Sequence, residues 1–389
     1  MAHQYYDEET EGTVYLVTPG VDDDEDMHHG PYSDSDMETI SSASTGRTAS
    51  TMTSDDVADH FREAYGTTYP MDENLPFTYP ADQIENRRQQ MQHVFLKALV
   101  HGNYIGPVQH VLRPRADGSR PRILDIRTLD GAWAQEMATE FPHCDITSVD
   151  IAPITAHIPR PNIAFEVYDL YAGVAEPDSS FDYVSCRHVQ LAVKEYDRLL
   201  FDLHRVLRPG GLLTVCEVEN YLFEVDNPPY TTLAYKSIPS LCHGINLVRT
   251  AVTNQGIDLD AIYRVGEWMR PGSDWWRRVG EKYNIPAAIV AQASSGIHPM
   301  NSQIILMPTG GWHPDPSVAQ VGSLICRTWQ LAWRQLEGLL SEDGLGEEEA
   351  KKVCRMCIDE LVQVNEGGVK ILSKYWMWWG FKAGQGDKD

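Results

Sequence analysis

The sequence lacks several features that would each assign it to a class of protein. No apolar run reaches the roughly 18 residues that a membrane-spanning helix needs, so we expect no membrane contact. Lysine and arginine number 32 against 56 aspartates and glutamates, and they form no cluster that could neutralise a phosphate backbone, so we expect no nucleic acid partner. The amino terminus is acidic where a secretory signal would be basic and then apolar. These absences predict a cytoplasmic or nuclear protein.

The cysteines argue against a disulfide framework. Their number, seven, is odd, and they are scattered through apparent core segments, which is typical of a reduced compartment. Cys354 and Cys357 form a lone Cys-x-x-Cys on a predicted helix, without a second pair or nearby histidine ligands. We therefore interpret both thiols as structural and predict no metal site.

Negative charge is concentrated at one end of the chain. Residues 1–56 hold fourteen acidic residues against the single basic residue Arg47, which gives them about -13 of the net charge of -24. Such a segment cannot bury enough apolar surface to offset its ordering entropy. We expect a disordered acidic arm, either a solubilising tail or an arm that binds a protein partner. Residues 57–383 should then form one folded domain.

Short apolar runs and helical patterns alternate between about residues 122 and 219. This alternation, with short connections, predicts a Rossmann-like, doubly wound and mostly parallel α/β sheet. The five expected strands are residues 122–126, the run that ends at Asp150, and residues 163–167, 181–185 and 212–217.

The segments around this core are expected to be mainly helical. A helix over 80–99 should lie across the sheet and close over a ligand, with one apolar face made of Ile84, Met91, Val94, Phe95, Ala98 and Leu99. Residues 220–310 should form a cap or substrate region, and residues 311–383 the last helices and strand. The further expected helices are 55–64, 232–256, 258–269, 316–340 and 347–365, and the further strands are 284–290, 303–306 and the aromatic run 371–381.

Carboxylates follow three successive predicted strands. Asp125, Asp150 and Asp169 all stand at strand ends, and residues 186–189 follow the fourth strand. In an open parallel sheet, the ligand sits beyond the carboxyl ends of the strands. Asp150 follows Asp125 at roughly the spacing at which an acidic residue binds ribose hydroxyls. Each carboxylate alone could cap a helix, but three in succession favour a ligand pocket.

The turn after the first strand has an unusual composition. Turns at this position normally carry two or three glycines, so that the backbone can approach a ligand closely. Here Arg127 and Leu129 occupy two of those places, and only Gly131 remains. Whether this turn still holds a cofactor decides what the protein does.

The segments just described resemble the class I S-adenosylmethionine-dependent methyltransferases, and more narrowly the fungal LaeA-like and UMTA-type group linked to secondary metabolism. The resemblance covers about residues 58–383, nearly all of the expected folded chain. It is carried by the core segments 123–134, 140–142, 149–153, 180–187 and 207–213, and outside the core by 82–87, 92–93, 102–107 and 311–316.

This resemblance implies S-adenosyl-L-methionine as the cofactor. The turn from Asp125 to Gly131, including Arg127, would hold its methionine part, and Asp150 its ribose. Asp169 and Leu170 would flank the adenine.

The resemblance also places Arg187 and His188 on the substrate side. His188 is the candidate catalytic base, because it follows the fourth strand. Methyl transfer to an activated oxygen or nitrogen can also proceed largely by proximity and orientation.

The turn departs from the family pattern Asp-x-Gly-x-Gly-x-Gly. A left-handed Leu129 would cost roughly 1–2 kcal/mol, and one lost hydrogen bond to a charged ligand group roughly 1.5–3 kcal/mol. Together these would weaken cofactor binding by on the order of a hundredfold. Arg127 has two interpretations: it reaches the cofactor's carboxylate, or it pairs with Asp125 or Asp150 and fills the site itself.

Three functions are compatible with these residues. The first is a methyltransferase that acts on a small molecule or a protein in secondary metabolism. The second is a catalytically inactive fold used as a regulatory or interaction protein, with the acidic arm as its contact. The third is a methyltransferase scaffold repurposed for chemistry other than methylation. Fold similarity alone does not choose among them, because function depends on the site.

Overall fold

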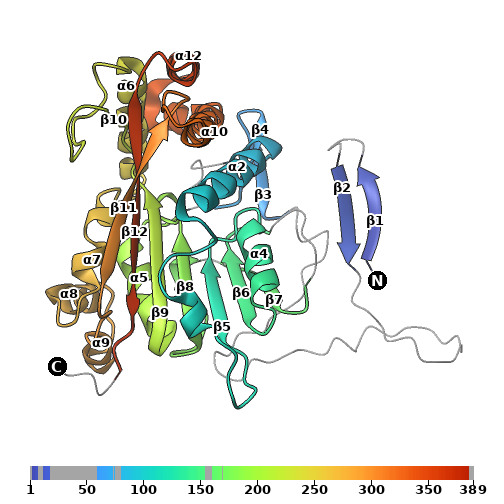
Figure 1. Ribbon diagram of the computed structural model, residues 1–389, viewed down its shortest axis with the longest axis vertical. Coiled ribbons are helices and arrows are strands. Elements are labelled where there is room, and N and C mark those ends of the chain that lie inside the picture. Colours follow the sequence, from blue (N-terminus) through green and yellow to red (C-terminus); the bar gives the residue numbers. More distant parts are fainter. Residues whose placement is uncertain are drawn as a thin grey trace, which may run out of the picture.

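The protein is described here from a computed structural model that covers residues 2–7, 12–17, 59–72, 74, 80–153, 160–168 and 170–384. Its centre is an eight-stranded sheet (Figure 1). The strands of the sheet are β5 (Arg122–Ile126), β6 (Asp145–Asp150), β7 (Ile163–Val167), β8 (Phe181–Arg187), β9 (Leu207–Val218), β10 (Phe223–Glu224), β11 (Asn301–Thr309) and β12 (Ile371–Phe381).

The strand order confirms the predicted doubly wound fold. Strands β7, β6, β5, β8 and β9 lie in that order and are parallel, whereas β12 is antiparallel to β9, β10 and β11. The chain runs outward from β5 through β6 to β7, and then returns to the other side of β5 with β8. The point where the strand order reverses therefore lies at the carboxyl end of β5, where open α/β sheets bind their ligands.

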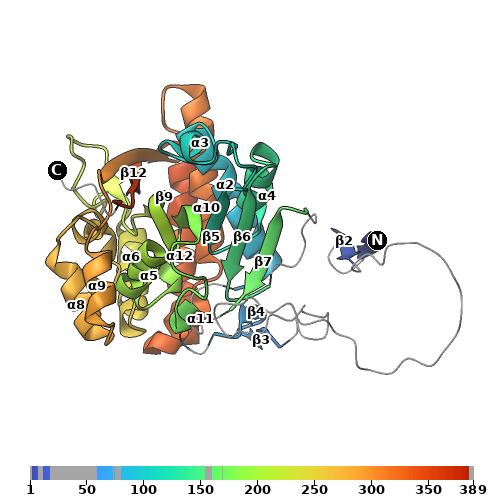
Figure 2. The same ribbon diagram turned by 90° about the horizontal axis from the view of Figure 1, so that it is seen from below.

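Helices cover both faces of this sheet (Figure 2). One face packs α3 and α4 against β5, β6, β8 and β9, and the other packs α5 and α7 to α9. The helices are α2 (Gln83–Val100), α3 (Val108–Val111), α4 (Ala132–Glu140), α5 (Tyr196–Val206), α6 (Pro239–Asn254), α7 (Val265–Trp268), α8 (Asp274–Lys282), α9 (Ala287–Ala293), α10 (Pro316–Trp333), α11 (Glu337–Leu340) and α12 (Glu347–Asn365).

The alternation of side chains along the strands explains this layering. On β5, Leu124 and Ile126 join the cluster under α5, while Ile123 joins the cluster under α4. Asp125 lies on the same side of the strand as Ile123, because successive side chains point to opposite faces. When a sheet is buried on both faces, each of its strands is a nearly continuous run of apolar residues in the sequence. These runs predicted the parallel core.

The predicted apolar face of α2 is correct at Phe95, which is buried, and at Leu99, which packs against the same core cluster, but it is wrong at other positions of the helix. The buried side chains of this helix include Glu85, Arg88 and Gln92, whereas Ile84 is 39% exposed and Val94 57% exposed. The apolar-face rule fails here because the polar side chains satisfy one another. The Arg88 guanidinium donates to both carboxylate oxygens of Glu85 at 2.6 Å and to Gln92 Oε1 at 2.9 Å.

Two further predicted elements have a different structure. Residues 61–64 are not helical but form β3 (Phe61–Ala64), which pairs with β4 (Thr67–Pro70) through a tight turn with positive φ at Tyr65 and Gly66. The strand predicted over 284–290 is instead the start of α9, because Pro286 precedes two alanines that favour helix. Such short apolar runs do not distinguish helix from strand.

Other predicted elements start later or break into shorter pieces. The helix expected over 232–256 begins only at Pro239, as α6. The helix expected over 258–269 is divided into the 3₁₀ turn Ala261–Tyr263 and α7.

The carboxyl-terminal segments match their predictions. Helices α10 to α12 cover the expected ranges, and β11 contains the strand expected at 303–306. The aromatic run 371–381 is β12 and completes the sheet. Within the acidic range 1–56, the structure describes only β1 (Ala2–Asp7) and β2 (Gly12–Val17), an antiparallel pair.

In the described part of the chain, every helix is too short or too polar to cross a bilayer.

Close backbone packing at Gly322 fixes the position of α10, and substitution there should destabilise the fold. A Cβ at this residue would collide with the Gly310 carbonyl oxygen and approach the Pro308 carbonyl oxygen at 2.9 Å. We expect Gly322→Ala to lower the free energy of unfolding by about 1–3 kcal/mol, as overpacking typically does. Chemical denaturation measures the change. Gly102→Ala is the control, since nothing lies within 4 Å of its Cβ. Equal stability of the two variants would contradict the packing described.

Candidate functional site

A cavity opens at the carboxyl ends of β5, β8 and β9, beneath α2 and α10. The empty space in it, counted together with its open mouth, is about 720 Å³. The polar residues that line it are Arg88, Gln92, Arg127, His188, Gln190, Glu217, Asn220 and Thr328. The apolar ones are Phe95, Leu191, Val218, Met307, Ile325, Trp329 and Ala332.

The turn after β5 keeps a left-handed backbone without its glycines. The φ angle is 70° at Arg127, 57° at Leu129 and 74° at Gly131. Residues other than glycine pay roughly 1–2 kcal/mol for this conformation, so the surroundings must enforce it. Arg127 N and Thr128 N both donate to the Val149 carbonyl oxygen, at 2.8 and 3.1 Å. The end of β6 therefore holds the turn in place.

Asp125 is a buried carboxylate at the end of β5. Its Oδ2 accepts a hydrogen bond from Ser148 Oγ at 2.8 Å, while its Oδ1 has no hydrogen-bond partner among the described residues. Burial raises the pKa of Asp125 to about 6, and the nearby Arg187 charge opposes that rise. This oxygen is itself buried, and Asp125 lines neither of the two cavities described here.

Asp150 is engaged with the turn itself. Its Oδ2 accepts from Leu129 N at 3.0 Å and its Oδ1 from Ile151 N at 2.8 Å. Burial raises the pKa of Asp150, and the charge of Arg127 opposes the rise. Asp169, the third predicted carboxylate, lies outside the described residues, and Leu170 packs against the core under α5.

Arg127 and His188 meet across the cavity. A guanidinium nitrogen of Arg127 donates to the His188 carbonyl oxygen. His188 has a φ of 57°, and its ring stacks on Tyr375 with 5.5 Å between centroids. Burial, followed by the charges of Arg187 and Arg127, holds the pKa of His188 well below its usual range. The imidazole is therefore neutral near pH 7, in the form that can accept a proton.

Glu217 ends the fifth parallel strand and faces the same cavity. Its Oε1 accepts from Val189 N and Gln190 N at 3.0 Å and from Tyr196 OH at 3.1 Å. Burial raises the pKa of Glu217 to about 7, against the effect of those donors. A carboxyl group poised near neutrality in a cavity is a functional candidate.

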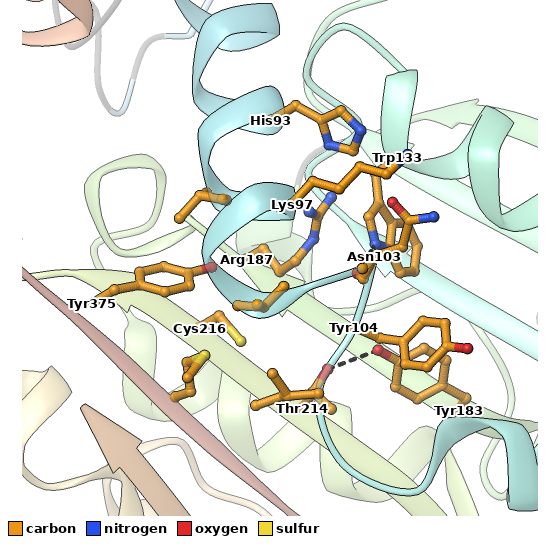
Figure 3. A pocket seen from close by; sticks show the side chains of 15 residues that line it. His93, Lys97, Asn103, Tyr104, Trp133, Tyr183, Arg187, Thr214, Cys216 and Tyr375 are labelled. Atoms are coloured by element: carbon orange, nitrogen blue, oxygen red, sulfur yellow. Dashed lines mark hydrogen bonds between the residues drawn. The ribbon is translucent and has the colours of Figure 1, made fainter. Parts of the chain in front are cut away.

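A smaller cavity lies beside the first, between α2 and the sheet. Figure 3 shows Arg187 and Trp133 below His93 and Lys97 of α2. The Arg187 guanidinium lies 4.6 Å from the centre of a Trp133 ring, a cation–π contact. Arg187 therefore lines the smaller cavity and not the main cavity, whose wall contains His188. It is close enough to Asp125 for its charge to lower the pKa of that carboxyl group.

The structure brings Arg127 into contact with His188, a pairing that the sequence did not predict, and it adds residues that the sequence reasoning missed. Glu217 carries the same signal as Asp125, a carboxylate at a strand's carboxyl end, and could have been found by that rule. Arg88 and Gln92 could have been found from their helical spacing with Glu85, which places polar residues on one stripe of α2.

The raised pKa of Glu217 predicts a pH-dependent stability. A carboxyl group with a pKa of about 7 in the folded protein and 4.5 otherwise favours folding below pH 4.5 and loses that contribution as pH rises through 7. The loss is on the order of 3 kcal/mol. We expect Glu217→Gln to be more stable relative to wild type at pH 8 than at pH 4.5, by chemical denaturation.

Glu219→Gln serves as the control for this prediction. Glu219 is also buried and accepts from Tyr263 OH at 2.6 Å and from Trp376 Nε1 at 2.7 Å, away from the cavity. A difference between Glu217→Gln and wild type that does not change with pH would show that folding does not raise the pKa of Glu217.

Part of this chain is similar to known methyltransferases. Residues 96–258 match the family model described as a methyltransferase domain. The chain is 26% identical to the secondary metabolism regulator laeA of Coprinopsis cinerea over 212 residues, which are 54% of this chain and 52% of that protein. It is 26% identical to the methyltransferase pytC of Aspergillus terreus over 253 residues, 64% of this chain and 66% of that protein.

A solved structure, that of Haemonchus contortus phosphoethanolamine N-methyltransferase 2 in complex with S-adenosyl-L-methionine, is 14% identical. Its superposition covers 82% of this chain and 62% of that one, with a TM-score of 0.37. The chain thus spans about half to two thirds of the length of the curated relatives named above. Residues 96–258 are thus similar to a methyltransferase domain, and the chain is similar to fungal methyltransferases and to LaeA-like regulators of secondary metabolism.

Proposed function

We propose that residues 57–383 form a methyltransferase-like domain that binds S-adenosyl-L-methionine at the turn after β5 and methylates a small molecule or a protein in secondary metabolism. The observation that carries the proposal is the left-handed backbone at Arg127, Leu129 and Gly131. This shape costs free energy without glycine, and here it recurs at three positions within residues 127–131, beside the cavity that Arg127 lines.

The residues of the site fit the amino-acid end of this cofactor. Asp125 Oδ1 is a buried acceptor with no partner in the described chain, which suits an ammonium donor. Arg127 lines the cavity and offers a guanidinium, the best geometric match for a carboxylate. The ribose assignment to Asp150 is less direct, since both carboxylate oxygens already accept from the backbone.

The chain's own residues have distinct tasks in this proposal. A bound S-adenosyl-L-methionine would supply the activated methyl group. Asp125 and Arg127 orient its amino-acid end, and Asp150 keeps the turn in shape through Leu129 N. His188, neutral near pH 7, can accept a proton from an acceptor group, and α2 with α10 limits the access of water.

One observation favours the inactive-fold alternative. Arg127 already donates to the His188 carbonyl, so its guanidinium is partly satisfied without a ligand. In that alternative, Arg127 fills the site and the chain acts through a protein partner. That the acidic arm of residues 1–56 makes this contact remains a prediction. A location in the cytoplasm or nucleus also remains a prediction.

Calorimetry with S-adenosylhomocysteine separates these functions. We expect wild type to bind, and Arg127→Gly to bind roughly tenfold or more weakly, because a charge-assisted hydrogen bond contributes about 1.5–3 kcal/mol. Arg127→Lys should recover part of the affinity, since lysine keeps the positive charge but lacks the planar guanidinium that donates two parallel hydrogen bonds to a carboxylate.

The opposite order of affinities would reject the proposal. If wild type does not bind and the double variant Arg127→Gly with Leu129→Gly does, Arg127 occupies the cofactor's place and the fold is inactive. Weaker binding in Arg127→Gly together with retained binding in Leu129→Gly alone would attribute the effect to the guanidinium rather than to backbone strain.

A further inference from the structure

One oxygen of the Glu217 carboxyl group accepts no hydrogen bond from the described chain and faces the cavity. All three donors that contact this group, Val189 N, Gln190 N and Tyr196 OH, go to Oε1. Within the described chain Oε2 accepts no hydrogen bond, yet it is absent from the buried atoms that lack a partner, so it contacts the cavity space. A carboxyl oxygen placed this way accepts a hydrogen bond from a ligand.

The walls around Glu217 are apolar. Phe95 from α2, Met307 from β11, and Ile325 and Trp329 from α10 line the cavity together with Leu191 and Val218. Their surfaces gain from burial of apolar ligand area at roughly 25 cal/mol per Å². Tryptophan and phenylalanine also provide flat faces for an aromatic ring. The cavity therefore combines an apolar enclosure with one hydrogen-bond acceptor.

The charges in the cavity decide between kinds of donor group. Arg88 is neutralised by its two-point ion pair with Glu85, at 2.6 Å on both oxygens. While the cofactor site is empty, Arg127 leaves a positive charge next to Glu217, which disfavours a cationic ligand such as an ammonium. A bound S-adenosyl-L-methionine would engage Arg127 but would bring its own positive sulfonium charge, with the same effect. An anionic ligand would meet the Glu217 carboxylate once Arg127 is engaged by the cofactor. A neutral hydroxyl group avoids both penalties.

We propose that this cavity binds a neutral, hydroxyl-bearing aromatic small molecule whose hydroxyl group donates to Glu217 Oε2. This inference rests on the proposed function, because it assigns Arg127 to the cofactor. It names the acceptor class as a phenol-like compound rather than a protein side chain or an amine. Glu217 becomes the residue that selects for a hydroxyl group and can take its proton.

Ionisation of Glu217 should make this binding pH-dependent. The groups that face it are Arg127 from the turn, His188 and Arg88 in the cavity wall, and Tyr196 from α5. Burial keeps the pKa of the neighbouring Cys186, Cys216, Tyr196 and Tyr375 above the usual range, so these remain neutral. Glu217 is thus the carboxyl group that ionises in this wall near pH 7.

Equilibrium dialysis of the full chain with four naphthalene probes tests the assignment, with and without saturating S-adenosylhomocysteine. We expect 2-naphthol to bind about tenfold more tightly than 2-methoxynaphthalene, 2-naphthoate or naphthylmethylammonium. Its binding should be about threefold tighter at pH 8 than at pH 6, since an ionised carboxylate is the stronger acceptor.

Three variants make the test specific. Glu217→Gln should weaken 2-naphthol binding about tenfold, abolish its pH dependence and leave the methyl ether unchanged. Glu219→Gln should change nothing. Ala332→Phe, which fills the cavity from α10, should remove binding of all naphthyl probes while S-adenosylhomocysteine still binds.

The possible failures are distinct. If S-adenosylhomocysteine does not bind wild type, the proposed function is wrong. If it binds but 2-naphthol does not, or if the ether, the carboxylate or the ammonium binds as tightly, the hydroxyl assignment is overturned. Probe binding that survives Ala332→Phe, or a preference that survives Glu217→Gln, also overturns it, because the probe then sits elsewhere or is held by another group.

Discussion

Hydrogen bonds from the end of β6 hold the turn after β5 in its left-handed shape. The Val149 carbonyl accepts from Arg127 N and Thr128 N, and the Asp150 carboxylate accepts from Leu129 N. These contacts offset the backbone cost that Arg127 and Leu129 pay in place of glycine. Through these contacts the end of β6 holds the turn at the position from which Arg127 lines the cavity. The rest of the site is arranged around this turn.

The site has two halves with different chemistry. On the turn side, Asp125 and Arg127 offer an acceptor and a cation suited to an amino-acid zwitterion. On the other side, Glu217 stands among apolar walls from α2, β11 and α10. His188 lies between the halves and is held by Arg127 and Tyr375. The proposed methyl transfer would use such a division, because cofactor and acceptor must each be oriented before they meet.

Several polar side chains that line this cavity are buried. Glu85, Arg88 and Gln92 form a ladder on α2 that satisfies itself, so the helix can close over the strand ends with a polar stripe facing inward. Glu217 is also buried with hydrogen-bond partners, since three donors bind one of its carboxylate oxygens. Two carboxylate oxygens, Asp125 Oδ1 and Glu217 Oε2, accept no hydrogen bond within the described chain. We expect ligands to donate to them.

The sequence by itself determined the parallel sheet, since strands buried on both faces leave apolar runs such as 122–126 and 181–185 that need no knowledge of their neighbours. It also indicated Asp125, Arg127 and His188 as candidates, because position at or just after a strand's end is a local property. It could not determine which face of α2 is buried, because Arg88 becomes a core residue only when Glu85 and Gln92 meet it across helical turns. Only the tertiary structure decided that Glu217 joins the site and keeps a free oxygen there, since its three donors come from a loop and a helix that the fold brings to the end of β9.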